Sequence, residues 1–273
     1  MKRVIVTGAG GTIGRALCER FRDTGAQVIG LDLTVPADAP VPILACDLTD
    51  QAQVEAAVGE AVARLRGLDL LVNNAGIGGP APAELPPDAV VRQQLEVNLL
   101  AAWSTTAAAL PALEEARGRV VFIASRMAAL ALPLAAAYGV SKRALVAYAD
   151  ALRLEVGTHV GVTVVYPSMI ASPIHDSTAA AGLSLDGVSR YEPVEGVVAA
   201  VIRAATARRP PADLATTRRG RLEIAIARHF PALARRMVTR TVSARLATGA
   251  FDNSPLAAGL RRRAGGEDRR TER

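Results

Sequence analysis

The sequence predicts a single α/β domain built on a doubly wound parallel sheet, and three observations support this prediction. Short apolar runs rich in β-branched residues recur along the chain, and Ala-rich segments with helical spacing separate them. Half of the residues are hydrophobic but only 3% are aromatic, so the core must consist mainly of Ala, Val, Leu and Ile. A chain of 273 residues is long enough to bury one substantial core without splitting into separate domains.

Strands and helices are expected to alternate over residues 1–210. Such alternation produces right-handed βαβ units, so the sheet should be parallel with helices on both faces. A third strand position is expected at Cys46-Asp47-Leu48. The other expected strands span residues 4–6, 27–31, 68–72, 119–123 and 162–165. The expected helices span residues 13–24, 51–66, 88–113, 136–156 and 194–208.

The two ends of the chain differ in charge. Residues 201–273 hold seventeen Arg against six acidic residues, a balance of +11, which leaves −5 for residues 1–200. Residues 211–260 are therefore expected to form a basic, amphipathic and partly helical extension, which covers the substrate site or contacts a surface or another subunit. Residues 261–273 are mostly charged or glycine and are expected to be a disordered tail.

Simple features argue against several classes of protein. The first apolar run has three residues after two charges, which is too short for a signal peptide. The longest uncharged apolar stretch, 127–140, is shorter than the ~20 residues of a membrane span and contains Pro133. Cys18 and Cys46 form no disulfide framework and lie in no Cys/His cluster. We therefore expect a cytoplasmic protein with reduced thiols and no metal site.

A glycine-rich turn follows the first expected strand and leads directly into the first helix. Glycine lets the backbone turn sharply and approach a pyrophosphate, which free N–H groups and the helix dipole stabilise. A tight turn without a ligand has a similar composition, but the position between first strand and first helix favours dinucleotide binding. The expected cofactor contacts in this turn are Gly8, Gly11, Thr12, Ile13 and Gly14.

Acidic residues end the second and third strands. Asp32 lies eighteen residues beyond Gly14, where a carboxylate accepts both ribose hydroxyls of the adenosine half and repels a 2′-phosphate. No Lys or Arg occurs in residues 8–14 or 31–37, so the expected cofactor is NAD rather than NADP. Asp47, which precedes Leu48, is placed to accept from the adenine amino group, although it is equally suited to cap the next helix.

Five motifs in this order resemble the short-chain dehydrogenase/reductase family. The resemblance covers residues 3–210 and implies a Rossmann-fold catalytic domain that interconverts CH–OH and C=O groups with a nicotinamide cofactor. The motifs are the glycine-rich turn, the strand-end run Asn73-Asn74-Ala75-Gly76, Asn98 within Val97-Asn98-Leu99, Ser125 after a strand, and Tyr138-Gly-Val-Ser-Lys142.

Tyr138 and Lys142 have the residue types and spacing that acid/base chemistry needs. They lie at i and i+4, so they share one face of a helix. A free phenol has a pKa of ~10, and a nearby ammonium together with an oxidised nicotinamide ring is expected to lower it. Tyr138 then exchanges a proton with the substrate oxygen while hydride passes between carbon and nicotinamide.

The resemblance implies roles for the remaining residues. Lys142 also holds the nicotinamide ribose, Ser125 hydrogen-bonds the substrate oxygen, and Asn98 anchors a water that relays the proton. Backbone near Ile170, after Pro167, meets the nicotinamide carboxamide. The residues expected to line the adenosine ribose are Asn74, Ala75 and Gly76.

The chain departs from the family pattern in two places. Thr12 replaces a glycine, so the spacing of Gly8, Gly11 and Gly14 resembles the extended branch of epimerases and dehydratases. Ser168 replaces the glycine after Pro167. The thirteen-residue Ser–Tyr spacing and the lack of a sugar-nucleotide domain after residue 200 favour the short, single-domain branch. An NAD-using epimerase or dehydratase, and a non-catalytic dinucleotide sensor, are the alternatives.

The expected substrate is a lipophilic or cyclic secondary alcohol or ketone. Residues 127–134 carry no charge, and the loop after Pro167 supplies apolar side chains. A lone loop histidine such as His175 is more often solvated than bound to substrate. The residues expected to cover the site as a lid are Ile174, Leu183 and Leu185.

The expected partners follow from the helices. The Ala-rich segments 98–113 and 136–156 have more apolar surface than one sheet face needs, which favours a homodimer or homotetramer. The basic segment 218–240 suits packing on the domain or on a neighbouring subunit better than contact with an anionic membrane surface. It lacks the interleaved aromatic residues of nucleic-acid binders, so no nucleic acid is expected.

Overall fold

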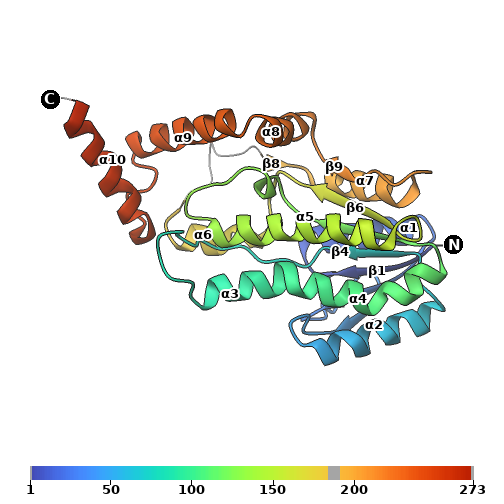
Figure 1. The fold of residues 1–273 in the computed structure, drawn as a ribbon. Coiled ribbons are helices and arrows are strands. Elements are labelled where there is room, and N and C mark those ends of the chain that lie inside the picture. The colour runs from blue at the N-terminus through green and yellow to red at the C-terminus, as the bar shows by residue number, and fades with distance from the viewer. Residues whose placement is uncertain (1, 184–190, 272–273) are drawn as a thin grey trace.

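A parallel sheet of seven strands forms the centre of the molecule (Figure 1). The computed structural model describes residues 2–183 and 191–271. The strand order is β3-β2-β1-β4-β5-β6-β9, and every pair of neighbours is parallel. The predicted doubly wound sheet is therefore confirmed. The strands are β1 (Arg3–Thr7), β2 (Gln27–Asp32), β3 (Ile43–Ala45), β4 (Leu70–Asn73), β5 (Arg119–Ile123), β6 (Gly161–Tyr166) and β9 (Asp213–Ala215).

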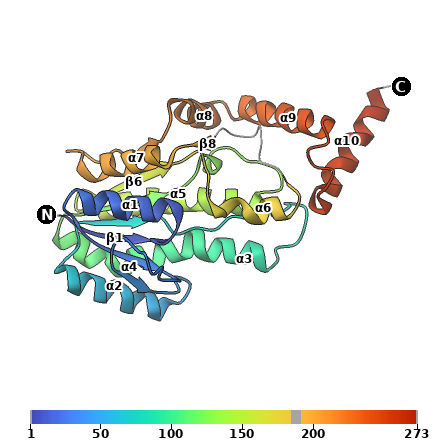
Figure 2. The same ribbon diagram turned by 180° about the vertical axis from the view of Figure 1, so that it is seen from behind.

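Helices cover both faces of the sheet, as the crossover rule requires. One face packs against α2 (Gln51–Leu65), α4 (Ala101–Glu115) and α5 (Ala136–Val156) (Figure 1). The other face packs against α1 (Thr12–Asp23) and α7 (Val194–Thr206), which lie in front when the molecule is seen from behind (Figure 2). Each layer buries its own apolar cluster, so the sheet is the shared wall of two cores.

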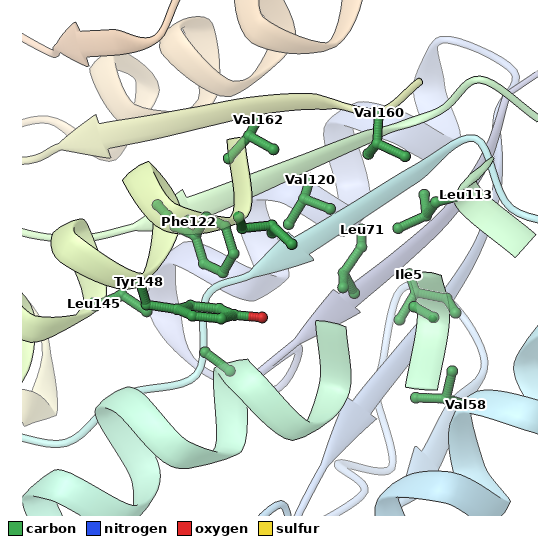
Figure 3. Packing of buried hydrophobic residues seen from close by; sticks show 14 of the residues in the cluster. Ile5, Val58, Leu71, Leu113, Val120, Phe122, Leu145, Tyr148, Val160 and Val162 are labelled. Carbon is green, nitrogen blue, oxygen red and sulfur yellow. The ribbon is translucent and has the colours of Figure 1, made fainter. Parts of the chain in front are cut away.

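Aliphatic side chains dominate the larger core, as the low aromatic content predicts. Leu71 and Val120 point from neighbouring strands toward the helices, and Phe122 meets the ring of Tyr148 edge-on at 5.6 Å between centroids (Figure 3). Full burial of side chains of this size contributes about 1.5–3 kcal/mol each. The core holds the strand ends in place, and with them the loops that form the site.

Four features of the fold differ from the expected elements. The third strand is β3 (Ile43–Ala45), which ends just before the expected position Cys46-Asp47-Leu48. The expected helix 88–113 consists of α3 (Ala89–Leu95), a π-helical turn over Glu96–Leu100, and α4. The seventh strand, β9, was not predicted, and it extends the sheet beyond residue 210. Short strands β7 (Met169–Ile170) and β8 (Tyr191–Glu192) pair outside the main sheet. Each depends on contacts between distant segments, which local periodicity does not report.

The C-terminal region consists of helices that pack on the sheet domain and then leave it. Ile224 of α8 (Arg218–His229) is buried in the main core, and Arg228 pairs with Asp213 at 2.8 Å. Helix α9 (Pro231–Ala247) follows α8, and α10 (Ala258–Thr271) projects away from the body (Figures 1 and 2). Within the described ranges, no helix is both long and apolar enough to cross a bilayer.

Helix α10 differs from the disorder expected for residues 261–273. It is helical through Thr271, and the last two residues lie outside the described part of the chain. Two arginines tie its first half to the body, which composition alone does not reveal. Arg261 donates to the Phe251 and Ser254 carbonyls, and Arg263 pairs with Glu84 at 2.6 Å.

Candidate active site

A cavity of about 790 Å³ opens beyond the carboxyl ends of the sheet strands. It lies where the strand order reverses between β1 and β4, the place where open α/β sheets bind ligands. Loops after β1, β2, β4, β5 and β6 all contribute to its lining. Every predicted site residue except Gly14 and Asn98 lines this cavity.

The glycine-rich turn forms one end of the cavity, and its geometry explains two of its glycines. Gly8 has a φ of +64°, and a Cβ there would lie 2.8 Å from the Ala75 Cα. A Cβ on Gly14 would lie 2.0 Å from the Gly8 carbonyl oxygen. Gly14 therefore packs α1 against the turn, whereas Thr12, the first residue of that helix, is exposed to the cavity.

Asp32 joins the second strand to the glycine-rich turn. Its Oδ2 accepts a hydrogen bond from the Gly10 N–H at 2.8 Å, and its Oδ1 accepts from the Thr34 N–H at 3.3 Å. Asp47 accepts from both the N–H and the hydroxyl of Thr49, so it stabilises the turn before α2. Asp32 and Asp47 both line the cavity, and both retain capacity to accept from a ligand.

Asn74 ties the end of β4 to the glycine-rich turn. Its Nδ2 donates to the carbonyls of Thr7 at 2.9 Å and Gly8 at 3.1 Å. The Thr7 hydroxyl accepts from the N–H groups of Asn74 and Ala75. A Cβ on Gly76 would lie 3.1 Å from the Lys142 Nζ, so glycine keeps the cavity open at this point.

Asn98 lies behind the cavity wall and is 1% exposed. Its Oδ1 accepts from the Ile77 N–H at 2.8 Å, and its Nδ2 donates to the Ile77 carbonyl and the Ser141 hydroxyl, each at 3.0 Å. The π-helical turn over Glu96–Leu100 presents the Asn98 side chain to these partners, and such turns are frequent at functional sites. Asn98 thus joins the loop after β4 to α5.

Ser125, Tyr138 and Lys142 meet in the middle of the cavity. Ser125 follows β5, while Tyr138 and Lys142 occupy successive turns of α5. The Ser125 Oγ accepts from the Met127 N–H at 3.1 Å, and the Ser125 side chain also interacts with the Tyr138 hydroxyl. The Lys142 Nζ lies 5.9 Å from the centre of the Tyr138 ring and donates to the Ile123 carbonyl at 2.9 Å.

Burial shifts the pKa of both titratable groups away from their charged forms. It raises the pKa of Tyr138, and the Ser125 hydrogen bond opposes this only in part. Burial also lowers the pKa of Lys142 to about 8. Lys142 itself points to a backbone carbonyl and is desolvated. The lowering expected for the pKa of Tyr138 depends also on the positive charge of an oxidised nicotinamide ring, and it stays a prediction.

A smaller cavity of about 100 Å³ adjoins the first and shares Ser125 and Tyr138 with it. Its other walls are largely apolar and include Met127, Leu132 and Met169. Ile174, a predicted lid residue, lines both cavities. Of the other two, Leu183 lines a third cavity farther out, and Leu185 lies outside the described residues.

His175 and Ser168 each have a defined structural partner. The His175 Nε2 lies 3.1 Å from the Ile170 carbonyl, and burial lowers the pKa of His175. Ser168, which stands where the family has glycine, donates its N–H to Glu192 at 2.8 Å. This bond holds the turn after Pro167 toward the cavity.

Arg126 is the residue of this region that the sequence did not single out. It follows Ser125 directly, lines the smaller cavity and pairs with Glu223 of α8. Arg219 also pairs with Glu223, at 2.8 Å. The uncharged segment 127–134 is thus preceded by a charged residue that lines the smaller cavity. The sequence feature that could have identified Arg126 is a charged residue directly after a strand-end serine.

This fold and this cavity together are those of an oxidoreductase that uses a nicotinamide dinucleotide. A model of the short chain dehydrogenase family matches residues 2–181, and the chain therefore belongs to that family. The protein is an oxidoreductase that acts on CH–OH groups.

Three relatives illustrate the similarity. L-fucose dehydrogenase from Bos taurus is 36% identical over 189 residues, which is 66% of this chain and 70% of the relative. The 1-deoxy-11-beta-hydroxypentalenate dehydrogenase of Streptomyces exfoliatus is 35% identical over 215 residues, 72% of this chain and 78% of the relative. The ligand-free structure of aldohexose dehydrogenase from Thermoplasma acidophilum superposes with a TM-score of 0.69 at 26% identity, covering 78% of this chain and 92% of the other.

The residues present fit a nicotinamide dinucleotide. Gly8 and Gly76 line the cavity at points where a Cβ would meet the Ala75 backbone or the Lys142 ammonium, so their lack of a side chain leaves room along the strand ends. The carboxylate of Asp32 stands beside the turn that would hold the pyrophosphate. The chain thus offers the N-terminus of α1, whose first N–H groups lack intrahelical partners, at one end of the cavity and the Ser125–Tyr138 hydroxyls at the other.

Proposed function

We propose that this protein is an NAD-preferring dehydrogenase/reductase that interconverts a secondary alcohol and a ketone on a lipophilic or cyclic small molecule. One observation carries the proposal: the hydroxyls of Ser125 and Tyr138 stand where the dinucleotide-sized cavity meets the smaller apolar one. A substrate in the smaller cavity would place its oxygen against both hydroxyls and its carbon toward the larger cavity.

The chain's residues would supply the proton chemistry. NAD, when bound, supplies a hydride acceptor or donor. Ser125 holds the substrate oxygen by a hydrogen bond, and Tyr138 takes the hydroxyl proton during oxidation or gives one during reduction. Lys142 places a positive charge behind Tyr138, which favours the phenolate, and Asn98 keeps the neighbouring backbone in register.

The preference for NAD rests on Asp32. Its carboxylate lies at the end of β2 and would accept hydrogen bonds from the adenosine ribose. A 2′-phosphate at the same place would meet a like charge, which costs several kcal/mol at an interface.

We also propose a setting for the enzyme. Cys18 and Cys46 are buried free thiols, which suits the reducing cytoplasm. Residues 211–260 would wall the substrate side rather than rest on a membrane, because Ile224 and Ala234 bury their side chains in the protein. Exposed apolar residues on α4 and α5 favour a homodimer or homotetramer.

The Tyr138→Phe variant tests the proposed chemistry. Removing the hydroxyl removes the acid/base, so kcat should fall by about 10²–10⁴ because general acid–base catalysis contributes that much. The affinity for NADH should change little, since the ring remains. Initial rates with a panel of cyclic and acyclic secondary alcohols, followed by NADH absorbance, measure the first quantity, and fluorescence titration measures the second. Full activity in Tyr138→Phe would refute the mechanism.

A further inference from the structure

A third cavity, of about 220 Å³, lies beside the proposed substrate site and has no part in the chemistry above. One wall is the segment after Ser125, and the other is formed by α8 and α9 of the C-terminal region. Its lining is mainly apolar. Representative lining residues are Leu130, Leu134, Leu183, Met237, Val242 and Phe251.

The third cavity adjoins the candidate active site. Four residues, Arg126, Met127, Leu132 and Thr178, line both it and the smaller cavity that contains Ser125 and Tyr138. A molecule bound at the two hydroxyls therefore needs to pass only these side chains to reach the third cavity. Of the cavities described above, only the third has walls from both the segment after Ser125 and the C-terminal helices α8 and α9.

The ionic groups at this passage are held in ion pairs. The Arg126 guanidinium pairs with Glu223, and both side chains are largely buried. Glu223 is also held by Arg219. Glu223 thus has two cationic partners at the passage. Beyond it the lining is mainly apolar apart from Arg245, which lies over the Phe251 ring, so most of the cavity suits hydrocarbon.

We propose that the third cavity binds the hydrocarbon chain of the substrate, so that the substrate is an alkyl-chain ketone or secondary alcohol with its oxygen near one end. This deepens the proposed function and rests on it. The volume suits such an occupant, since an apolar cavity of about 150 Å³ already accepts benzene. The C-terminal helices are then part of the specificity of the enzyme.

The dependence of rate on chain length tests this assignment. Methyl ketones from butanone to dodecanone are reduced with NADH, and kcat/KM is measured for each. Burial of each added methylene should raise kcat/KM about fourfold until the cavity is filled. Activity that does not depend on chain length would overturn the chain site and leave the proposed function intact.

Two substitutions in α9 give a matched pair. Ala234 is buried and lines the cavity, whereas Ala232, two residues earlier, is exposed. Ala234→Phe should abolish the gain for long ketones and leave butanone reduction unchanged, while Ala232→Phe should behave like the natural protein. An undiminished gain in Ala234→Phe would contradict the proposal.

Two further measurements test the proposal if Ala234→Phe does not fold or if none of the methyl ketones is reduced. Val242→Ala enlarges the cavity without adding bulk, so the plateau of kcat/KM should move to longer ketones, and an unmoved plateau would count against the assignment. Calorimetric binding of dodecanone needs no turnover. Binding lost in Ala234→Phe and kept in Ala232→Phe supports the chain site even if no ketone is reduced, and equal binding in the two overturns it.

Discussion

Burial of Lys142 is the costly feature of the site at the scale of single residues. The side chain is 3% exposed, and its ammonium has a backbone carbonyl rather than a carboxylate as partner. Desolvation of a charge in such a place destabilises the folded protein, and other contacts of the fold must compensate for it. Such a group is typical of a functional site, which agrees with its role in the proposed reaction. The lowered pKa of Lys142, about 8, records this cost.

The free energy of unfolding should depend on pH in a way that reveals the cost of burying the Lys142 ammonium. Between pH 8 and about 10.5, the unfolded chain holds a proton on Lys142 that the folded protein releases, so stability rises with pH across that window. Lys142→Met removes the charge and should be more stable than the natural protein at pH 7 by at most about 3 kcal/mol.

Guanidinium unfolding of both proteins at pH 7 and pH 10.5 measures this difference. The difference in free energy of unfolding between the two proteins should be smaller at pH 10.5, because Lys142 of the folded natural protein is neutral there. Groups such as Cys18, whose pKa burial raises to about 12, affect both proteins alike and cancel in the comparison. A gap that is constant with pH would show that Lys142 is not desolvated.

Asp32 accepts a hydrogen bond from the Gly10 N–H and also carries a negative charge, and a substitution can separate these two properties. Asp32→Asn keeps an acceptor for the Gly10 N–H but removes the charge, so the ratio of kcat/KM for NAD over NADP should fall about tenfold or more. Asp47→Asn, in the same cavity, serves as the control and should leave the ratio near its natural value. Steady-state rates with both cofactors decide the matter, and an unchanged ratio in Asp32→Asn would remove the basis for NAD preference.

At the scale of elements, the junction between β1 and α1 depends on close backbone contact. Thr12 begins α1 where the family has glycine, and its side chain is accommodated because it faces the cavity. Gly14 faces inward, where the Gly8 carbonyl leaves no space for a side chain. The glycine spacing is therefore set by packing of the helix on the turn.

Two helix glycines test this reading. Gly14→Ala should lose about 1–3 kcal/mol of stability through overpacking and should weaken NADH binding. Gly59→Ala in α2, where no atom lies within 4 Å of the added Cβ, should gain about 0.5–1 kcal/mol through helix propensity. Thermal and denaturant unfolding measure both changes, and equal effects at the two positions would contradict the packing argument.

At the scale of the whole molecule, exposed apolar residues gather on the outer faces of the two helices α4 and α5. Trp103 of α4 is 51% exposed and stacks on Tyr148 of α5, and Val140 and Leu154 of α5 are more exposed still. Exposed large apolar side chains on two neighbouring helices favour an interaction surface there. Both helices lie on one side of the sheet (Figure 1), so one surface would serve a two-fold partner.

Charge introduced on that surface should dissociate the oligomer. Trp103→Arg combined with Leu154→Glu should give the mass of a single chain in analytical ultracentrifugation, where the natural protein gives a dimer or tetramer. Leu222→Glu changes another exposed leucine, on α8, and should leave the mass unchanged. A natural protein that sediments as a monomer would refute the proposed assembly.

Local patterns in the sequence predicted the main elements of the fold and the likeness of the site to a known family. Alternation of apolar strands with Ala-rich helices was enough for the doubly wound sheet, because periodicity reflects burial of one face of each element. Tyr138 and Lys142 were found by their spacing on a single helix, which α5 confirms. The glycine-rich turn was found because it directly follows a strand.

Only the tertiary structure decided what lies around these residues. The pairing of Arg126 with Glu223, the position of β9 beside β6, and the direction of the Lys142 ammonium toward Ile123 join segments that are far apart in the chain. No local periodicity encodes such contacts, because they depend on how finished elements pack. For the same reason, the sequence by itself determined the class of the enzyme, whereas packing of α8 and α9 against the segment after Ser125 formed the cavity to which we assign the substrate chain.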